Sequence, residues 1–285
     1  MIWVLAGTRD GREIVNLLCK KGYHVLASTV TSYGEALVKG EFADRRVDMN
    51  MEIEMDASGP CNGCKTLMGA LDLHEMVRVI REEGVDWVID ATHPFAEEVS
   101  KNAQRACRET EARYVRFERD RTTLPLDDAP MSGMLIKVNT ASEAAEKAVE
   151  CGDVIFLTTG SKTLDVFVKR AFEKKKRVIA RVLPDADVIR RCLELGLLPR
   201  DIVAMQGPFS KELNKALLQE YNASVMVTKE SGRVGGTDTK IAAALELGIP
   251  VVLIERPEVN YERVITSYEG ILSLLGYGDF MTGSV

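Results

Sequence analysis

The sequence lacks any apolar run long enough to span a membrane. Its longest apolar runs, such as residues 249–254, are of strand length, whereas a spanning helix needs about 20 apolar residues. The first residues also lack the basic leader of an export signal, because Gly7 and Arg9 follow a very short apolar stretch. We therefore expect a cytoplasmic protein with no membrane partner.

An excess of positive charge is also missing. The 285 residues include 37 Lys and Arg against 43 Asp and Glu, a net charge of −6. Nucleic-acid binding usually needs a basic face, which this balance does not supply, so we expect no nucleic-acid partner. A hydrophobic content of 46% excludes wholesale disorder, and the length allows two domains.

A second CxxC motif is absent, although residues 61–64 form one. A structural zinc site needs about four ligands, so we expect no metal site. A surface insertion with free thiols and an accessory metal or redox role both remain open for Cys61 and Cys64. In the cytoplasm all six cysteines are expected to stay reduced. The remaining four are expected to be small buried hydrophobes: Cys19, Cys107, Cys151 and Cys192.

Strand-like apolar runs alternate with amphipathic helical segments along the chain. This alternation predicts an α/β fold of two Rossmann-like domains, with mostly parallel sheets that flank a central cleft. We place an irregular or inserted region at residues 39–70 and a linker at 118–134. The expected domains are residues 1–125 and 126–285. Strands are expected at residues 2–6, 23–29, 85–90, 112–117, 135–138, 154–158, 178–183, 202–205, 224–228 and 250–255.

The first post-strand motif, residues 6–11, lies between the first strand and the first helix. Compared with G-x-G-x-x-G it keeps only the third glycine, Gly11, so an ordinary strand–turn–helix junction is the alternative. Backbone N–H groups at a helix start attract phosphate. Thr29 and Thr31 stand where an NAD site usually has an acid, and with Arg9 nearby this favours NADP. The residues expected to bind the cofactor are Gly7, Thr8, Arg9, Asp10, Gly11, Thr29, Thr31 and Thr92.

The second motif, residues 90–96, closes another strand. Asp90, Thr92 and His93 bring a carboxylate, a hydroxyl and an imidazole to one strand end, and Pro94 suits the first turn of a helix. This grouping favours a functional site, with a structural histidine as the alternative.

Three further motifs follow strands in the second half, at residues 158–162, 206–210 and 228–240. The glycines, hydroxyls and basic residues of 158–162 and 228–240 favour an anionic ligand. A capping motif is the alternative for residues 158–162, and a structural glycine turn is the alternative for residues 228–240. None matches the Walker A pattern. The residues expected to bind substrate are Thr159, Gly160, Ser231, Gly232, Arg233, Gly235, Gly236 and Lys240.

Taken in this order, the motifs resemble those of the precorrin-6A reductase family, which includes enzymes acting on cobalt-precorrin-6A. The resemblance covers nearly the whole chain, and residues 51–65 depart from it. It implies two Rossmann-like domains and NADPH-dependent reduction of one double bond of an anionic tetrapyrrole, (cobalt-)precorrin-6A, to the 6B form in cobalamin biosynthesis. It rests on Gly7-Thr8 with Asp10-Gly11, residues 90–96, 158–160, 206–209 and 228–232, Gly235-Gly236 and Lys240.

Given such a reaction, His93 with Asp90 beside it is our candidate proton donor, and water is the alternative. Lys229 is the third candidate catalytic residue and, with Lys240, could clamp substrate carboxylates. A tetrapyrrole synthase or lyase without nicotinamide is a rival function. A non-catalytic nucleotide-sensing module is another, although the charged stretch from Lys229 to Lys240 argues against it.

Overall fold

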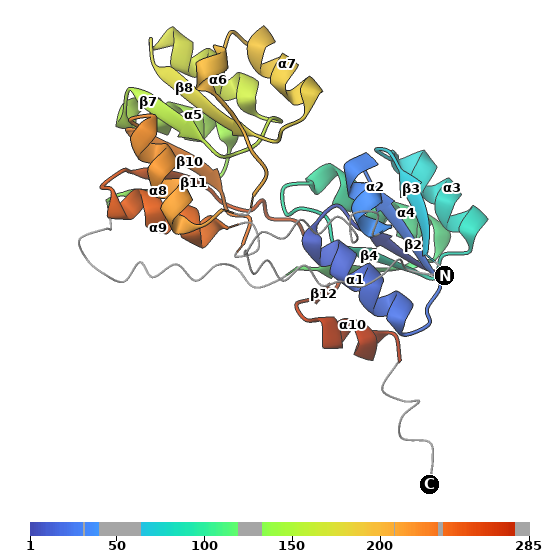
Figure 1. Cartoon of the computed structure of the whole chain (residues 1–285). Coiled ribbons are helices and arrows are strands. Elements are labelled where there is room, and N and C mark those ends of the chain that lie inside the picture. The colour runs from blue at the N-terminus through green and yellow to red at the C-terminus, as the bar shows by residue number, and fades with distance from the viewer. Residues whose placement is uncertain (31, 40–63, 119–132, 208, 233–235, 277–285) are drawn as a thin grey trace, which may run out of the picture. The chain divides into compact units, whose positions relative to one another are not determined.

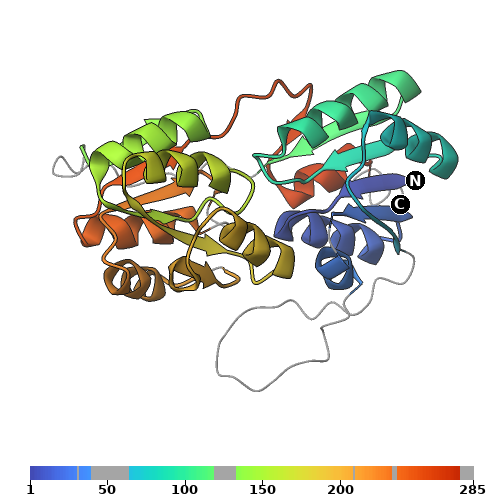
Figure 2. The same ribbon diagram turned by 90° about the horizontal axis from the view of Figure 1, so that it is seen from above.

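The computed structural model describes residues 1–30, 32–39, 64–118, 133–207, 209–232 and 236–276. The chain divides into two compact units (Figure 1). Unit 1 comprises Met1–Arg119 together with Glu258–Val285, and unit 2 comprises Asp120–Pro257. Each unit contains a six-stranded sheet in which every strand pair is parallel, with helices on both faces (Figure 2). The predicted α/β class with two Rossmann-like units is therefore confirmed.

Unit 1 has the strand order β12-β5-β4-β1-β2-β3. Its strands are β1 (Ile2–Leu5), β2 (Val25–Thr29), β3 (Cys64–Met68), β4 (Trp87–Asp90), β5 (Arg113–Phe117) and β12 (Val264–Ile265). Its helices are α1 (Arg9–Lys20), α2 (Ser32–Val38), α3 (Leu73–Glu83), α4 (Glu97–Thr110) and α10 (Tyr268–Leu274).

The four central strands of unit 1 are buried on both faces because their residues alternate between two apolar layers. Ile14 and Leu18 of α1 pack with Ile271 of α10 on one face. Met76 of α3 and Ala103 of α4 pack on the other. A continuous apolar strand such as Ile2–Leu5 therefore needs helices on both sides, as in parallel sheets generally.

Unit 2 repeats this architecture with the strand order β6-β11-β10-β7-β8-β9. Its strands are β6 (Leu135–Val138), β7 (Val154–Leu157), β8 (Arg177–Val182), β9 (Ile202–Ala204), β10 (Val225–Lys229) and β11 (Val251–Ile254). Its helices are α5 (Ala141–Cys151), α6 (Leu164–Glu173), α7 (Ala186–Glu194), the 3-10 turn η2 (Pro199–Asp201), α8 (Lys211–Glu220) and α9 (Thr237–Glu246).

The C-terminal segment differs from the expected second domain of residues 126–285, because from Glu258 onward it belongs to unit 1. Val264 and Ile265 extend the sheet by pairing with β5, and α10 lies beside α1 (Figure 1). Ile271 is fully buried there. Burial of this apolar side chain explains the return, and a two-residue strand gives too short a pattern to be predicted.

Two further features differ from the sequence-based expectation. Strand β3 lies within residues 39–70, which were expected to be irregular. It is a partly exposed edge strand that includes Lys65 and Thr66, so it lacks the continuous apolar run of a buried strand. Cys19 is disulfide-bonded rather than reduced, whereas Cys107 and Cys192 are free and buried as expected.

Within the described ranges, no helix is both long and apolar enough to cross a membrane.

Candidate active site

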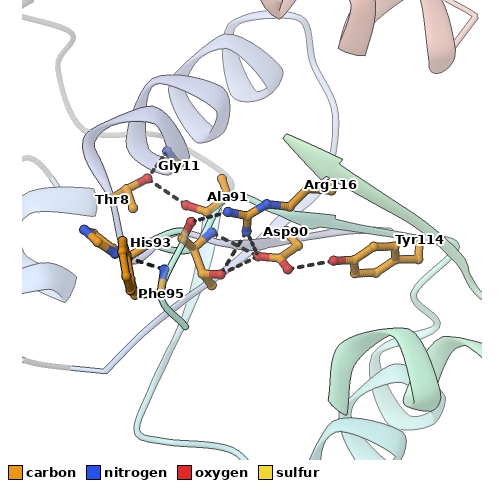
Figure 3. A network of polar contacts seen from close by, with 9 residues as sticks. Thr8, Gly11, Asp90, Ala91, His93, Phe95, Tyr114 and Arg116 are labelled. Atoms are coloured by element: carbon orange, nitrogen blue, oxygen red, sulfur yellow. Dashed lines mark hydrogen bonds and ion pairs between the residues drawn. The ribbon is translucent and has the colours of Figure 1, made fainter. Parts of the chain in front are cut away.

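The direction of the strand order in unit 1 changes between β1 and β4. In doubly wound sheets ligands bind at such a switch point, outside the carboxyl ends of the strands. The two motifs predicted in the first half of the chain follow these two strands and are bonded to each other (Figure 3). The hydroxyl of Thr8 donates to the carbonyl of Ala91 over 2.7 Å and accepts from the N–H of Gly11 over 3.1 Å.

The two glycines of the loop after β1, Gly7 and Gly11, have different surroundings. Thr8 is the N-cap of α1, in extended conformation. A Cβ added to Gly11 would lie 2.6 Å from the Cα of Ala6, so only glycine lets α1 pack this close to the strand. A Cβ added to Gly7 meets no atom of the described chain within 4 Å. Close helix–strand packing and an open backbone approach are what dinucleotide-binding loops require of their glycines.

Asp90, at the end of β4, is the centre of a buried polar network. Its side chain is 0% exposed and forms an ion pair of 2.9 Å with Arg116, which is 1% exposed. Its oxygens also accept from the hydroxyl of Thr92 (2.7 Å) and from that of Tyr114 (2.7 Å). Arg116 in turn donates to the carbonyl of Thr92 over 3.0 Å. The network therefore fixes the turn that leads to His93.

The charge of Asp90 follows from this environment. Burial alone would raise its pKa, but the Arg116 guanidinium and hydrogen bonds from Ser100 and Thr92 hold it below its usual value. Burial and the neighbouring Asp90 raise the pKa of Tyr114, which stays protonated and donates. Asp90 is thus an ionised, fully buried acceptor. Its contacts are those of a positioning residue, and the catalytic role expected for it stays a prediction.

His93 is exposed, in contrast to Asp90. Its Nδ1 accepts a hydrogen bond of 3.2 Å from the backbone N–H of Phe95. Since Nδ1 is an acceptor here, the proton of the neutral ring belongs on Nε2. Figure 3 shows the ring on the side of the network that carries Thr8, away from Tyr114.

Of the other residues expected to contact the cofactor, the structure describes Arg9, Asp10 and Thr29. Arg9 pairs with Glu13 at 2.7 Å, and Asp10 accepts from the hydroxyl of Tyr268 on α10 at 3.3 Å. Thr29 is buried at the end of β2. Thr31 lies outside the described residues.

Unit 2 has its own switch point, between β7 and β10. Thr158 and Gly160 follow β7, and the loop that contains Ser231 and Gly232 follows β10, so two more predicted motifs are neighbours. Gly160 and Gly232 both have φ near +76°, which favours glycine. Thr159 is 7% exposed, and its hydroxyl has no hydrogen-bond partner in the part of the chain that the structure describes.

The loop after β10 is held from inside. The hydroxyl of Ser231 lies 3.0 Å from the hydroxyl of Thr237. The Thr237 hydroxyl donates to the carbonyl of Lys229. Arg256 and Glu230 form a buried ion pair. Gly236, in left-handed conformation, begins α9. The described residues of this loop are therefore held by contacts within unit 2.

Burial and like charge lower the pKa of both predicted lysines. Burial and the nearby Lys162 lower the pKa of Lys229. Burial and Arg181 lower the pKa of Lys240 to about 8, against a smaller opposite effect of Asp238. Arg233 and Gly235 lie outside the described residues, as do Cys61 and the rest of residues 40–63.

Sequence reasoning missed the partners that hold these motifs in place, above all Arg116, Tyr114 and Arg181. Arg116 lies in a strand correctly predicted at residues 112–117. A charged residue inside a buried strand was a usable signal, because such a charge needs a partner.

The fold and the two strand-end sites place the chain among the Rossmann-like α/β proteins. A family model described as "Precorrin-6x reductase CbiJ/CobK" matches residues 1–56 and 51–276. The chain therefore belongs to this family, as the sequence motifs predicted, and it is an enzyme of the reductase class.

Individual relatives agree with this assignment. A "Cobalt-precorrin-6A reductase" of Priestia megaterium is 41% identical over 276 residues, which cover 96% of this chain and 98% of that protein. One of Methanothermobacter thermautotrophicus is 41% identical over 263 residues, 91% of this chain and 77% of that protein. A solved structure titled "CobK precorrin-6A reductase" has a TM-score of 0.73 at 26% identity, over 97% of this chain and 96% of that chain.

Proposed function

We propose that this protein reduces one ring double bond of cobalt-precorrin-6A with NADPH, giving cobalt-precorrin-6B in cobalamin biosynthesis. The two relatives at 41% identity carry the cobalt-precorrin name. A "Precorrin-6A reductase" of Rhodococcus erythropolis is 34% identical over 64% of this chain. The higher identity to the two enzymes named for cobalt-precorrin-6A favours the cobalt-bearing substrate.

The observation that carries the cofactor proposal is the pair of glycines after β1. Gly11 allows α1 to approach β1, and Gly7 leaves its backbone open. The N–H groups at the start of α1, with Thr8 as the cap, would hold the pyrophosphate. Strand β2 ends at Thr29 without an acid, which favours a 2′-phosphate over a free ribose hydroxyl.

When bound, NADPH supplies a hydride to one carbon of the ring double bond, and the neighbouring carbon takes a proton. To donate that proton from Nε2, His93 would have to be an imidazolium with Nδ1 protonated as well. This requires Nδ1 to give up the hydrogen bond that it accepts from the backbone N–H of Phe95. Lys229, together with Ser231 and Gly232 of unit 2, would orient the substrate carboxylates. If His93→Ala kept near-normal turnover and an unchanged pH profile, water would be the acid.

Substitution of the two glycines tests the cofactor site. We expect Gly7→Ala to leave the free energy of unfolding within about 0.5 kcal/mol of wild type, because its Cβ meets open space, but to raise the Kd of NADPH at least tenfold. Gly11→Ala, the matched control, should destabilise the fold because its Cβ meets Ala6. Wild-type NADPH affinity in Gly7→Ala, measured by calorimetry, would contradict this cofactor site.

A further inference from the structure

Arg116 of unit 1 is a buried arginine whose guanidinium is not fully hydrogen-bonded. Its Nη1 pairs with Asp90 at 2.9 Å, and its Nη2 donates to the carbonyl of Thr92 at 3.0 Å (Figure 3). Its Nε has no hydrogen-bond partner in the part of the chain that the structure describes. Burial of an unpaired polar group costs free energy. We therefore expect another contact to stabilise this side chain.

Arg256 of unit 2 is buried beside a carboxylate as well, but it is bonded differently. Its Nε forms an ion pair with Glu230 and also donates to the carbonyl of that residue over 3.4 Å. In Arg116 both Nη atoms bond to the turn after β4, whereas the Nε side of the guanidinium lacks such a partner. The carboxylate alone therefore does not fix the orientation of Arg116.

An aromatic ring on the segment that returns to unit 1 supplies a further contact. Tyr261 precedes β12, and the centroid of its ring lies 5.3 Å from the Cζ of Arg116. The face of an aromatic ring attracts a cation within about 6 Å, and more strongly where water is partly excluded. Tyr261 is partly buried and packs against the apolar cluster that includes Ala103 and Tyr114.

The same returning segment holds the backbone of Arg116. The N–H of Arg116 donates to the carbonyl of Arg263 over 2.9 Å, and the N–H of Glu118 donates to that of Ile265 over 3.0 Å. Ring and backbone contacts thus reach Arg116 from residues that are close together in sequence. The position of the guanidinium therefore depends on residues 261–265 as well as on Asp90.

Ser100 on α4 connects Tyr261 to the same network by a second route. Ser100 is 1% exposed, and its hydroxyl is hydrogen-bonded with both Asp90 and Tyr261. A hydroxyl has only one proton to donate, and the ionised carboxylate is the stronger acceptor. The hydroxyl of Tyr261 is therefore the donor to Ser100.

We propose that Tyr261 is a positioning residue for the reduction, and that its ring holds the Arg116 guanidinium against Asp90 and Thr92. This inference rests on the proposed function, because the turn that Arg116 fixes leads to His93. The effect of Tyr261 on His93 passes through Arg116 and this turn. It should therefore appear in kcat rather than in the binding of substrate or cofactor.

Two variants separate the ring of Tyr261 from its apolar packing. Tyr261→Leu keeps an apolar side chain without a ring, and we expect it to lower kcat about tenfold, as loss of a partly buried cation–ring contact would. The KM for cobalt-precorrin-6A and the Kd of NADPH should stay within about twofold of wild type. Tyr261→Phe keeps the ring and loses only the contact with Ser100, so it should retain most of kcat.

Tyr23→Leu is the matched control, since Tyr23 is a partly buried tyrosine that packs in the other apolar layer of unit 1. This variant should keep the wild-type kcat. A wild-type kcat in Tyr261→Leu, or equal losses in Tyr261→Leu and Tyr261→Phe, would overturn the role given to the ring.

Hydrogen exchange on the full chain gives a readout that does not need the reaction. The N–H of Thr92 donates to Asp90 over 3.0 Å, so its protection reports on the turn. In Tyr261→Leu we expect this protection to fall about tenfold, while protection in α1 stays at the wild-type level. Unchanged protection at Thr92 would contradict the positioning role. Absence of turnover in wild type would instead contradict the proposed function, and the exchange result would still decide the role of Tyr261.

Pentafluorophenylalanine in place of Tyr261 keeps the inference testable if Tyr261→Leu fails to fold. Fluorine withdraws electron density from the face of the ring, which removes the attraction for a cation while the aromatic shape is kept. We expect this variant to lose kcat about tenfold and to lower the protection of Thr92. A kcat equal to that of Tyr261→Phe would show that the ring acts by packing alone and would overturn the proposal.

Discussion

At the scale of residues, the ion pair between Asp90 and Arg116 determines the shape of the site in unit 1. Both side chains are buried, and their hydrogen bonds include Thr92 and Tyr114. The pair matters because loss of one partner leaves the other charge buried and uncompensated.

We predict that Asp90→Asn lowers the free energy of unfolding by about 3–5 kcal/mol, as for other broken buried pairs. Asp86→Asn is the control, since Asp86 is paired with the N-terminus while 69% exposed, and such pairs contribute little. Urea denaturation of both variants measures the difference. Equal losses would show that Asp90 does not anchor the network.

Lys240 gives a second residue-scale prediction, on pH. Its pKa in the folded protein is about 8, against about 10.4 when unfolded. Between these values the unfolded chain keeps the proton that the folded chain has released, so stability rises with pH across this window, by about 1.4 kcal/mol per unit at most. Below pH 8 this contribution is flat. Denaturation from pH 7 to 10.5 should show the rise in wild type relative to Lys240→Met. Parallel profiles would contradict it.

How much of the site was predictable differs from residue to residue. Residues 6–11 and 90–96 are contiguous in sequence and follow recognisable strands, so their meeting at one sheet edge followed from parallel topology. Arg116 and Arg181 are separated from their partners by 26 and 33 residues. Their role depends on which strands become neighbours, and local pattern does not encode that order.

At the scale of elements, the return of the chain to unit 1 is the main departure from expectation. Strand β12 has only two residues, and α10 has seven. Both are short, so their tertiary contacts rather than their propensity decide where they lie. Tyr268 of α10 stacks on Phe117 with ring centroids 5.2 Å apart, and its hydroxyl contacts Asp10. The C-terminal helix therefore supports the first turn of α1.

Ile271→Ala is predicted to cost about 2–5 kcal/mol of stability in unit 1, because it removes a fully buried side chain. Leu193→Ala on α7, where the side chain is 45% exposed, should change stability far less. Because α10 contacts α1, the Ile271 variant should also weaken NADPH binding. Hydrogen exchange would locate the loss: protection should fall in α1 and β5. Unchanged exchange there would contradict the role given to α10.

At the scale of the whole molecule, two sheets of one architecture carry their motifs at equivalent places. The switch point lies between β1 and β4 in unit 1 and between β7 and β10 in unit 2. Strand–helix alternation was enough to predict the fold class and most strands. It was not enough to divide the chain, because residues 258–276 follow unit 2 in sequence but belong to unit 1.

The net charge of −6 describes the whole chain and gives little information about its ligand. Under the proposed function, the lysines that would meet substrate carboxylates are local, at Lys229 and Lys240, whereas the net charge counts every acidic and basic residue of the chain. An anionic cofactor and a polycarboxylated substrate are therefore compatible with an acidic protein.

We propose that this family member transfers a hydride from NADPH to a precorrin-6A-type ring. The most direct test incubates the purified protein anaerobically with cobalt-precorrin-6A and NADPH, and follows cofactor absorbance together with product mass. We predict one NADPH consumed per ring, a product heavier by two hydrogens, and at least tenfold lower efficiency with NADH. Conversion of the substrate without NADPH consumption, or no conversion at all, would contradict the account.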